Sequence, residues 1–304
     1  MFPTITQRLM MLVGLLLVIW PAMWVGELVA GAAVSLAAGR WSAGVTLVVM
    51  VLGLLPAVVV GAVLSSTGNV LSGVWLVGAA AVAMGVSGGV SSVGAAGGGG
   101  MDAVVRASPT SGTMTWLALE SGVWGLAVVG LWLGLKSVRP GLRGWLARRV
   151  GGRWVTPKPG GKREKGWADG RALGAGLVTA AVGGAVVWVA LRSSGSGQVV
   201  AAGVVGMMVG GLAGRLALPG AHALLSLVAP AGLAMVGFWL AGQGLVGLRE
   251  SEVLGLWHVG DWVPIARGLP LVLVGSGLVG VTMGLGLGQS VERAVERSKS
   301  GGEV

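Results

Sequence analysis

One of the two histidines in the chain stands close to an aspartate. His258 and Asp261 are three residues apart in the stretch GLWHVGDWVPI (255–265), which is rich in tryptophan. On a helix, residues at that spacing share a face, so the two side chains can pair, open the last membrane span by fixing its start, or take part in proton exchange near a membrane surface. Tryptophan beside polar residues is also typical of a plain interfacial anchor.

The other polar residues inside apolar runs are few. They are Glu27, Glu120, Arg215 and His222. A charged side chain at the centre of a bilayer costs about 3 kcal/mol, so each is a functional candidate, the alternative being an interface position where the side chain reaches water. Glu120, which lies one turn into its predicted helix, is the strongest candidate. Its expected role is either proton buffering or a structural hydrogen bond.

Catalysis by these residues alone is poorly supported. The chain has no cysteine, and its two histidines are 36 residues apart, so we expect neither a closed metal site nor haem ligation. The tetrapeptide Gly85–Gly88 (GVSG), with Ser87 and the distant His222, resembles the serine and histidine of rhomboid intramembrane proteases. In a span rich in Gly and Ser such a match arises easily by chance.

The composition is that of a membrane protein. Of 304 residues, 54% are hydrophobic and 11% are charged, and the apolar runs are continuous, without the alternation of a barrel strand. We therefore predict an all-α, polytopic transmembrane helix bundle of about eight spans. The predicted spans are 9–38, 43–64, 70–95, 115–135, 172–191, 198–218, 220–246 and 264–288.

Basic residues concentrate in one segment. Between Lys136 and Arg171 lie eleven of the 21 Lys and Arg, against only Glu164 and Asp169. The positive-inside rule places such a loop on the cytoplasmic or matrix side, where anionic lipid or acidic neighbours are its expected partners rather than nucleic acid. The predicted parts are N-terminal helices (1–114), a helix with Glu120 (115–135), a basic loop (136–171), C-terminal helices (172–290) and a polar tail (291–304).

Four motifs follow one another in an order that is familiar from one family. GTMTWLALE (112–120), GGRWVTP (151–157), GAHALLS (220–226) and WHVGD (257–261) resemble G-x-x-L-F-x-x-S-E, GG-x-WPP, G-x-H and WH-x-x-D of cytochrome c oxidase subunit III. The interval between the histidines is also similar to the family's. The positions that carry the resemblance are Gly112, Glu120, Gly151, Gly152, Trp154, Trp188, His222, Trp257, His258 and Asp261.

The chain also departs from the family pattern. Residues 189–191 replace a histidine pair that the family carries after the tryptophan matched by Trp188, and the family's acid before the WH is met only approximately, by Glu250 or Glu252. Three predicted spans instead of two precede Glu120, so the resemblance implies a seven-helix core with one added N-terminal span.

The resemblance implies a non-catalytic core subunit of cytochrome c oxidase, respiratory complex IV. Its partners would be subunits I and II, accessory subunits and phospholipids, with haem a and copper in the catalytic subunits and no cofactor in this chain. It implies support of the catalytic subunit, lipid binding, oxygen access and proton uptake. Glu120 would be a buried carboxylate, and Glu120, His258 and Asp261 are the proton-related candidates. Trp257, Arg249 and Arg267 are the candidates for lipid head-group contacts.

The sequence also carries expectations about the membrane in which the chain lies and about alternative functions. The resemblance implies the mitochondrial inner membrane, or a bacterial inner membrane as the alternative, and it places the basic loop on the outer side, opposite to the charge rule. A secondary transporter made of two four-helix halves is the alternative function, and a rhomboid-like serine protease is a remote one.

Overall fold

The structure is a computed structural model that describes residues 5–29, 43–67, 69–90, 101, 104–105, 110–150, 169–191, 196–259, 266 and 268–300. Its described part is helical and contains no strand. Eight of its helices are long and apolar enough to cross a membrane. The all-α, polytopic fold predicted from the sequence is therefore confirmed.

The helices follow the predicted spans closely. A short helix, α10, lies between α9 and α11. The bounds are α1 (Ile5–Val29), α2 (Ala43–Thr67), α3 (Val70–Val90), α6 (Ser111–Val150), α7 (Gly170–Ala190), α8 (Ser196–Ala217), α9 (Leu224–Gly244), α10 (Glu250–Val259) and α11 (Pro270–Ser300).

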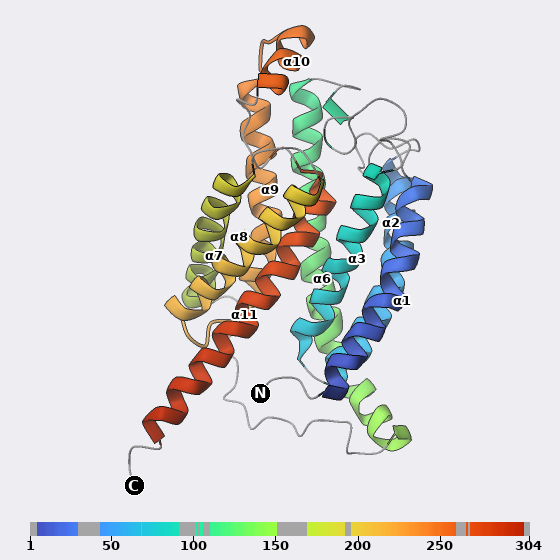
Figure 1. Cartoon of the computed structure of the whole chain (residues 1–304), viewed down its shortest axis with the longest axis vertical. Coiled ribbons are helices and arrows are strands. Elements are labelled where there is room, and N and C mark those ends of the chain that lie inside the picture. The colour runs from blue at the N-terminus through green and yellow to red at the C-terminus, as the bar shows by residue number, and fades with distance from the viewer. Residues whose placement is uncertain are drawn as a thin grey trace.

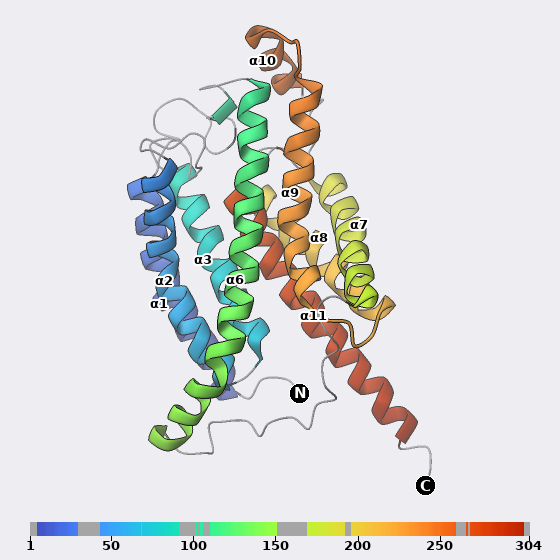
Figure 2. The same cartoon turned by 180° about the vertical axis from the view of Figure 1, so that it is seen from behind.

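The two halves of the chain share one bundle. Helices α1, α2 and α3 lie on one side, α7, α8 and α9 on the other, and α6 and α11 run between them (Figures 1 and 2). Helix α6 packs on α9, and α11 packs on both α8 and α3. Each half therefore depends on the other for the burial of its helices.

Glycines bring the backbones of α7, α8 and α11 together. A Cβ atom on Gly206 would lie 2.9 Å from the carbonyl oxygen of Gly183, and one on Gly211 would lie 2.9 Å from that of Val281. Between helices in lipid, where hydrophobic association is weak, such small residues permit close van der Waals packing. The glycines of α8 at 203, 206, 210 and 214 face neighbouring helices at every position.

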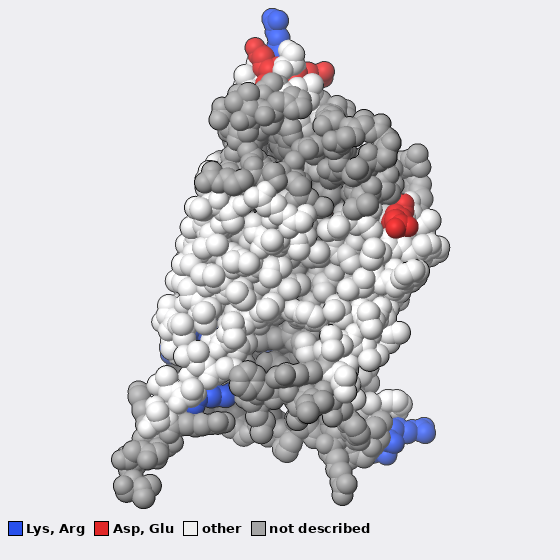
Figure 3. Space-filling view, viewed as in Figure 1, with Lys and Arg blue, Asp and Glu red and all other residues white. Residues whose placement is uncertain are grey.

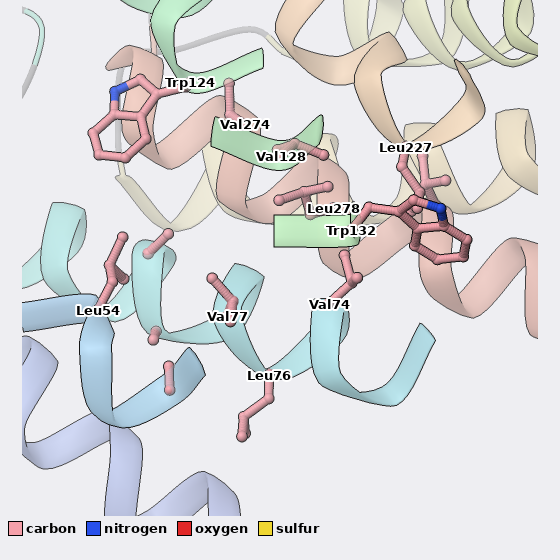
Figure 4. Close-up of a cluster of buried hydrophobic side chains, with 14 of the residues drawn as sticks. Leu54, Val74, Leu76, Val77, Trp124, Val128, Trp132, Leu227, Val274 and Leu278 are labelled. Atoms are coloured by element: carbon pink, nitrogen blue, oxygen red, sulfur yellow. The ribbon is translucent and has the colours of Figure 1, made fainter. Parts of the chain in front are cut away.

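One buried face of α6 forms the centre of the core. Trp124, Val128 and Trp132 follow one another at four-residue intervals, so they lie on one side of the helix. Figure 4 shows Trp132 beside Leu227 of α9, and Val128 near Val274 and Leu278 of α11. The side chains that meet them in this cluster include Leu54, Val74, Val77, Leu227, Val274 and Leu278.

Two helices extend beyond their predicted ends. The predicted basic loop was to begin at 136, but α6 continues to Val150, and the predicted polar tail is helical as far as Ser300. Arg148 and Arg149 lie in the last turn of α6, where positive charges interact favourably with the negative end of the helix dipole. The remainder of the basic segment, 151–168, is outside the described residues.

The stretch that was expected to open the last span lies elsewhere. Trp257 and His258 are near the end of α10, and α11 begins only at Pro270, so this expectation was wrong. Proline is favoured in the first turn of a helix because its missing N–H would have no partner there. The helix start is therefore set by Pro270 rather than by a His–Asp pair.

Charge divides the bundle along its axis. A broad uncharged band covers the middle of the face shown in Figure 3, with Lys and Arg mainly below it and Asp and Glu above it. The lower end holds the end of α6, the start of α7 and the end of α11 (Figure 1). Residues 5 and 300 lie at this same basic end, as eight antiparallel crossings require.

Two glycine-to-alanine variants, one at a close helix contact and one at an open position, test the packing of α7 on α8. A Cβ on Gly210 would lie 2.9 Å from the Gly183 Cα, whereas one on Gly130 meets nothing within 4 Å. We expect Gly210→Ala to destabilise the folded protein by about 1–3 kcal/mol, because backbone must move, and Gly130→Ala to cause no loss. Circular dichroism during denaturing-detergent titration measures both, and equal midpoints for the two variants would contradict the packing.

Candidate functional site

Glu120 is enclosed inside the bundle. Its side chain lies on the buried face of α6, and the residue is 3% exposed. The indole Nε1 of Trp124, one turn later, donates a hydrogen bond to its Oε1 at 3.4 Å, which is long for such a bond. The structure thus places an acid in a membrane-crossing helix away from lipid, as the sequence predicted.

The buried face of α6 continues from Glu120 toward the basic end. Trp132, three turns below, is buried, and its Nε1 has no hydrogen-bond partner among the described residues. The ring of Trp132 meets that of His222 edge to face, with centroids 5.9 Å apart and planes at 80°. The buried face of α6 therefore carries Glu120 near its start and contacts His222 further along, through Trp132.

His222 organises the start of α9. It is 8% exposed, and its Nδ1 accepts a hydrogen bond from the backbone N–H of Leu224 at 3.3 Å. This N–H belongs to the first turn of α9 and has no partner within the helix. An accepting Nδ1 carries no proton, so the neutral ring has its proton on Nε2. The contacts assign His222 a capping and packing role.

Arg215 ties three segments together at the basic end. Its Nη2 forms an ion pair with Glu292 Oε2 at 2.7 Å, and its Nη1 donates to the carbonyl oxygen of Ala221 at 3.1 Å. The side chains of Arg215 and Glu292 are 15% and 21% exposed. Arg171, in the first turn of α7, connects that helix to the same region, because its side chain donates a hydrogen bond to the carbonyl oxygen of Pro219 at 2.9 Å.

Glu292 is a functional contact that the sequence pattern does not reveal. It stands in a segment with the alternating charges of a solvated tail, and 77 residues separate it from Arg215. The available signal was indirect, since an arginine within an apolar run requires a counter-charge, and the carboxylates of the tail were among the few candidates.

The serine and histidine of the protease interpretation lie at opposite ends of the bundle. Asn69, just before α3, donates a hydrogen bond from its side-chain amide to Gln289 of α11 at 3.4 Å. Gln289 is one turn from Glu292, which pairs with Arg215, and Arg215 also bonds the carbonyl oxygen of Ala221 beside His222. The start of α3 therefore lies at the same end of the bundle as His222. Ser87 is 18 residues further along α3, about 27 Å away. Its Oγ donates to backbone carbonyl oxygens of α1 and α3 at 2.9 and 3.0 Å.

The remaining candidates are scattered. Gly112 is exposed in the first turn of α6, and Trp188 is 45% exposed on α7. Arg249 is exposed ahead of α10, where its backbone N–H donates to Glu252 Oε2 at 2.7 Å and thereby caps the helix. For Trp257 and His258 the structure describes the backbone alone, and Gly151, Gly152, Trp154, Asp261 and Arg267 are outside the described residues.

The described spans are also uninterrupted. Prolines lie inside α1, α2, α6 and α9, yet each of these helices continues through its proline. Paired broken helices, which shape the substrate sites of many transporters, are not found in this part of the chain. No three His, Asp or Glu side chains gather as potential metal ligands among the residues with described positions.

A small apolar cavity of about 20 Å³ lies between α7, α8, α9 and α11. Its walls include Val187, Met207, Pro230 and Leu273. A cavity with such walls stays dry, because a buried water needs polar partners. Only a very small apolar molecule fits this volume.

Together these features define a polytopic, all-α membrane protein in which Glu120 lies on α6, and Arg215 and His222 lie at the basic end of the bundle. Comparisons with protein-family models, with curated proteins and with solved structures each find no match for this chain. This chain is identified as a multi-pass membrane protein by its eight long apolar helices.

The Arg215–Glu292 pair is open to a direct test. We expect Arg215→Gln to lower the free energy of unfolding by about 2 kcal/mol, because it leaves a partly buried carboxylate without its cation. Adding Glu292→Gln should restore part of the loss. The exposed Arg171 is the matched control, and Arg171→Gln should cost less. Additive losses in the double variant, measured by denaturing-detergent titration, would refute the coupling.

Proposed function

We propose that this chain is a non-catalytic core membrane subunit of cytochrome c oxidase. The observation that carries the proposal is the burial of Glu120 on α6, which the resemblance to subunit III requires of that position. In addition, His222 directly precedes α9, the second-last membrane-crossing helix, as the family order implies. Because Trp257 and His258 belong to α10, the proposal does not rely on them.

The polar contacts fit a supporting role. Glu120 bonds within its own helix, His222 caps α9, and Arg215 joins α8 to α11. Each of these groups stabilises helix positions. In the proposal, haem a and copper belong to the catalytic subunits, and this chain supplies structure around them.

The outer surface of the bundle supplies the area for partners and lipid. Large apolar side chains face outward on α1 and α6, including Trp20 (79% exposed) and Leu126 (74% exposed). Catalytic subunits and phospholipid tails are the proposed neighbours of this surface. The apolar interior, including the small cavity beside Met207, is a medium in which oxygen dissolves more readily than protons or ions.

The proposed compartment is the mitochondrial inner membrane, with a bacterial inner membrane as the alternative. Both compartments hold oxidases of this kind. The proposal assigns Glu120 as a proton buffer for the complex, and Arg249 at the acidic end as a contact for lipid head groups.

Co-purification tests the assignment to an oxidase. When the chain is captured from gently solubilised membranes, we expect the reduced-minus-oxidised visible spectrum of the eluate to show an a-type haem band, together with oxygen consumption. A haem-free eluate, from membranes in which the oxidase stayed intact, would overturn the proposal and favour solute transport. Flux measurements on reconstituted vesicles then address the transporter.

A carboxylate exchange tests the proton role of Glu120. We expect Glu120→Gln to leave assembly intact and to accelerate the loss of oxidase activity during turnover, because the amide keeps the shape but does not exchange a proton. The exposed Glu27 of α1 is the control, and Glu27→Gln should leave durability unchanged.

A second variant separates the proton role from structure. Trp124→Phe removes the hydrogen bond to Glu120 and retains the carboxylate. If durability depends on the proton of Glu120, this variant should outlast Glu120→Gln. Wild-type durability of Glu120→Gln would count against the proton role.

A further inference from the structure

The last part of α6 leaves the bundle. Forty residues of α-helix extend about 60 Å, twice the roughly 30 Å thickness of the hydrocarbon core. Figures 1 and 2 show that the lower end of α6 turns away from the other helices. Pro140 lies within this region, and an internal proline is a usual cause of a helix bend. Residues 136–150 are called the surface helix below.

The surface helix is amphipathic. Val138, Leu142, Trp145 and Leu146 are spaced by four, three and one residues, so they share one face. Val138 is 52% and Trp145 50% exposed, although they are apolar. Lys136, Arg139 and Arg143 lie along a neighbouring, basic side of the helix, and Arg149 continues the apolar row one turn beyond Trp145, at the end of the helix.

The charge of this helix selects its partner. With Arg148 and Arg149 it carries five cations and no acidic residue. We propose that the surface helix lies along the membrane at the basic end of the bundle. Its apolar face enters the boundary between head groups and acyl chains, and its cations contact anionic phospholipid head groups.

Continuity with the bilayer favours lipid over a protein partner. The preceding turns of α6 cross the hydrocarbon, so the apolar face of the surface helix emerges where acyl chains begin. Tryptophan is enriched at this depth, and long arginine side chains reach outward from it to phosphate. Each cation close to an anionic leaflet contributes about fivefold to the partition. This inference is independent of the proposed oxidase function.

Spin labels measure the depth of the surface helix in the full chain. Because the chain has no cysteine, one introduced cysteine can be labelled uniquely. Val138→Cys reports the apolar face. Gly144→Cys reports the polar side, where an added Cβ meets nothing within 4 Å. In vesicles of phosphatidylcholine with phosphatidylglycerol, we expect the label at 138 to collide with oxygen and to be protected from a water-soluble nickel complex, and the label at 144 to show the reverse.

Charge variants test the choice of lipid. Replacing Arg143, Arg148 and Arg149 by Gln should reduce the contrast between the two labels, and replacement by Lys should retain it. Vesicles of phosphatidylcholine alone should also reduce the contrast. A label at Leu126→Cys, which is 74% exposed on the spanning part of α6, must stay deep in every variant and thereby confirms insertion.

Three results overturn the inference. Equal exposure of both labels to the nickel complex, with Leu126 still deep, means that the surface helix projects into water. Protection of position 138 from both reagents means that its apolar face packs against protein. An unchanged contrast without phosphatidylglycerol means that anionic head groups are not recognised.

Discussion

The close approach of α8 to α7 and α11 is the contact on which the rest of the bundle depends. In lipid, apolar side chains gain little by meeting one another, so helices associate where their backbones come close enough for dense van der Waals contact. Gly206 provides this contact toward α7, and Gly280 and Gly284 provide it toward α8 from the side of α11. Since α11 also packs on α3, this seam connects the two halves of the chain.

The seam explains where the polar groups lie. With α8 held beside α11, Arg215 reaches Glu292, and the same arginine fixes the turn that precedes His222. His222 then starts α9 against the ring of Trp132. Glu120, higher on α6, accepts a hydrogen bond from the indole of Trp124. The Arg215–Glu292 ion pair forms a fixed joint between α8 and α11.

Two helices extend beyond the hydrocarbon, and both do so at the basic end. Helix α6 carries its arginines there, and α11 carries the carboxylate that Arg215 binds. The charge rule favours the cytoplasmic or matrix side for this end, whereas the resemblance to subunit III implies the outer side. A membrane protein built in this way has one end rich in basic side chains and a central uncharged band that matches the acyl chains of a bilayer (Figure 3).

The sequence by itself determined the eight spans, because an apolar run of sufficient length has no alternative to a helix in lipid. The resemblance to subunit III also implied a buried carboxylate at Glu120, and this residue is buried in the structure. Only the tertiary structure decided that Glu292 pairs with Arg215 and that His222 meets Trp132, because these contacts join distant residues through packing. It also assigned His258 to α10, since apolar composition alone does not distinguish a short surface helix from the first turn of a span.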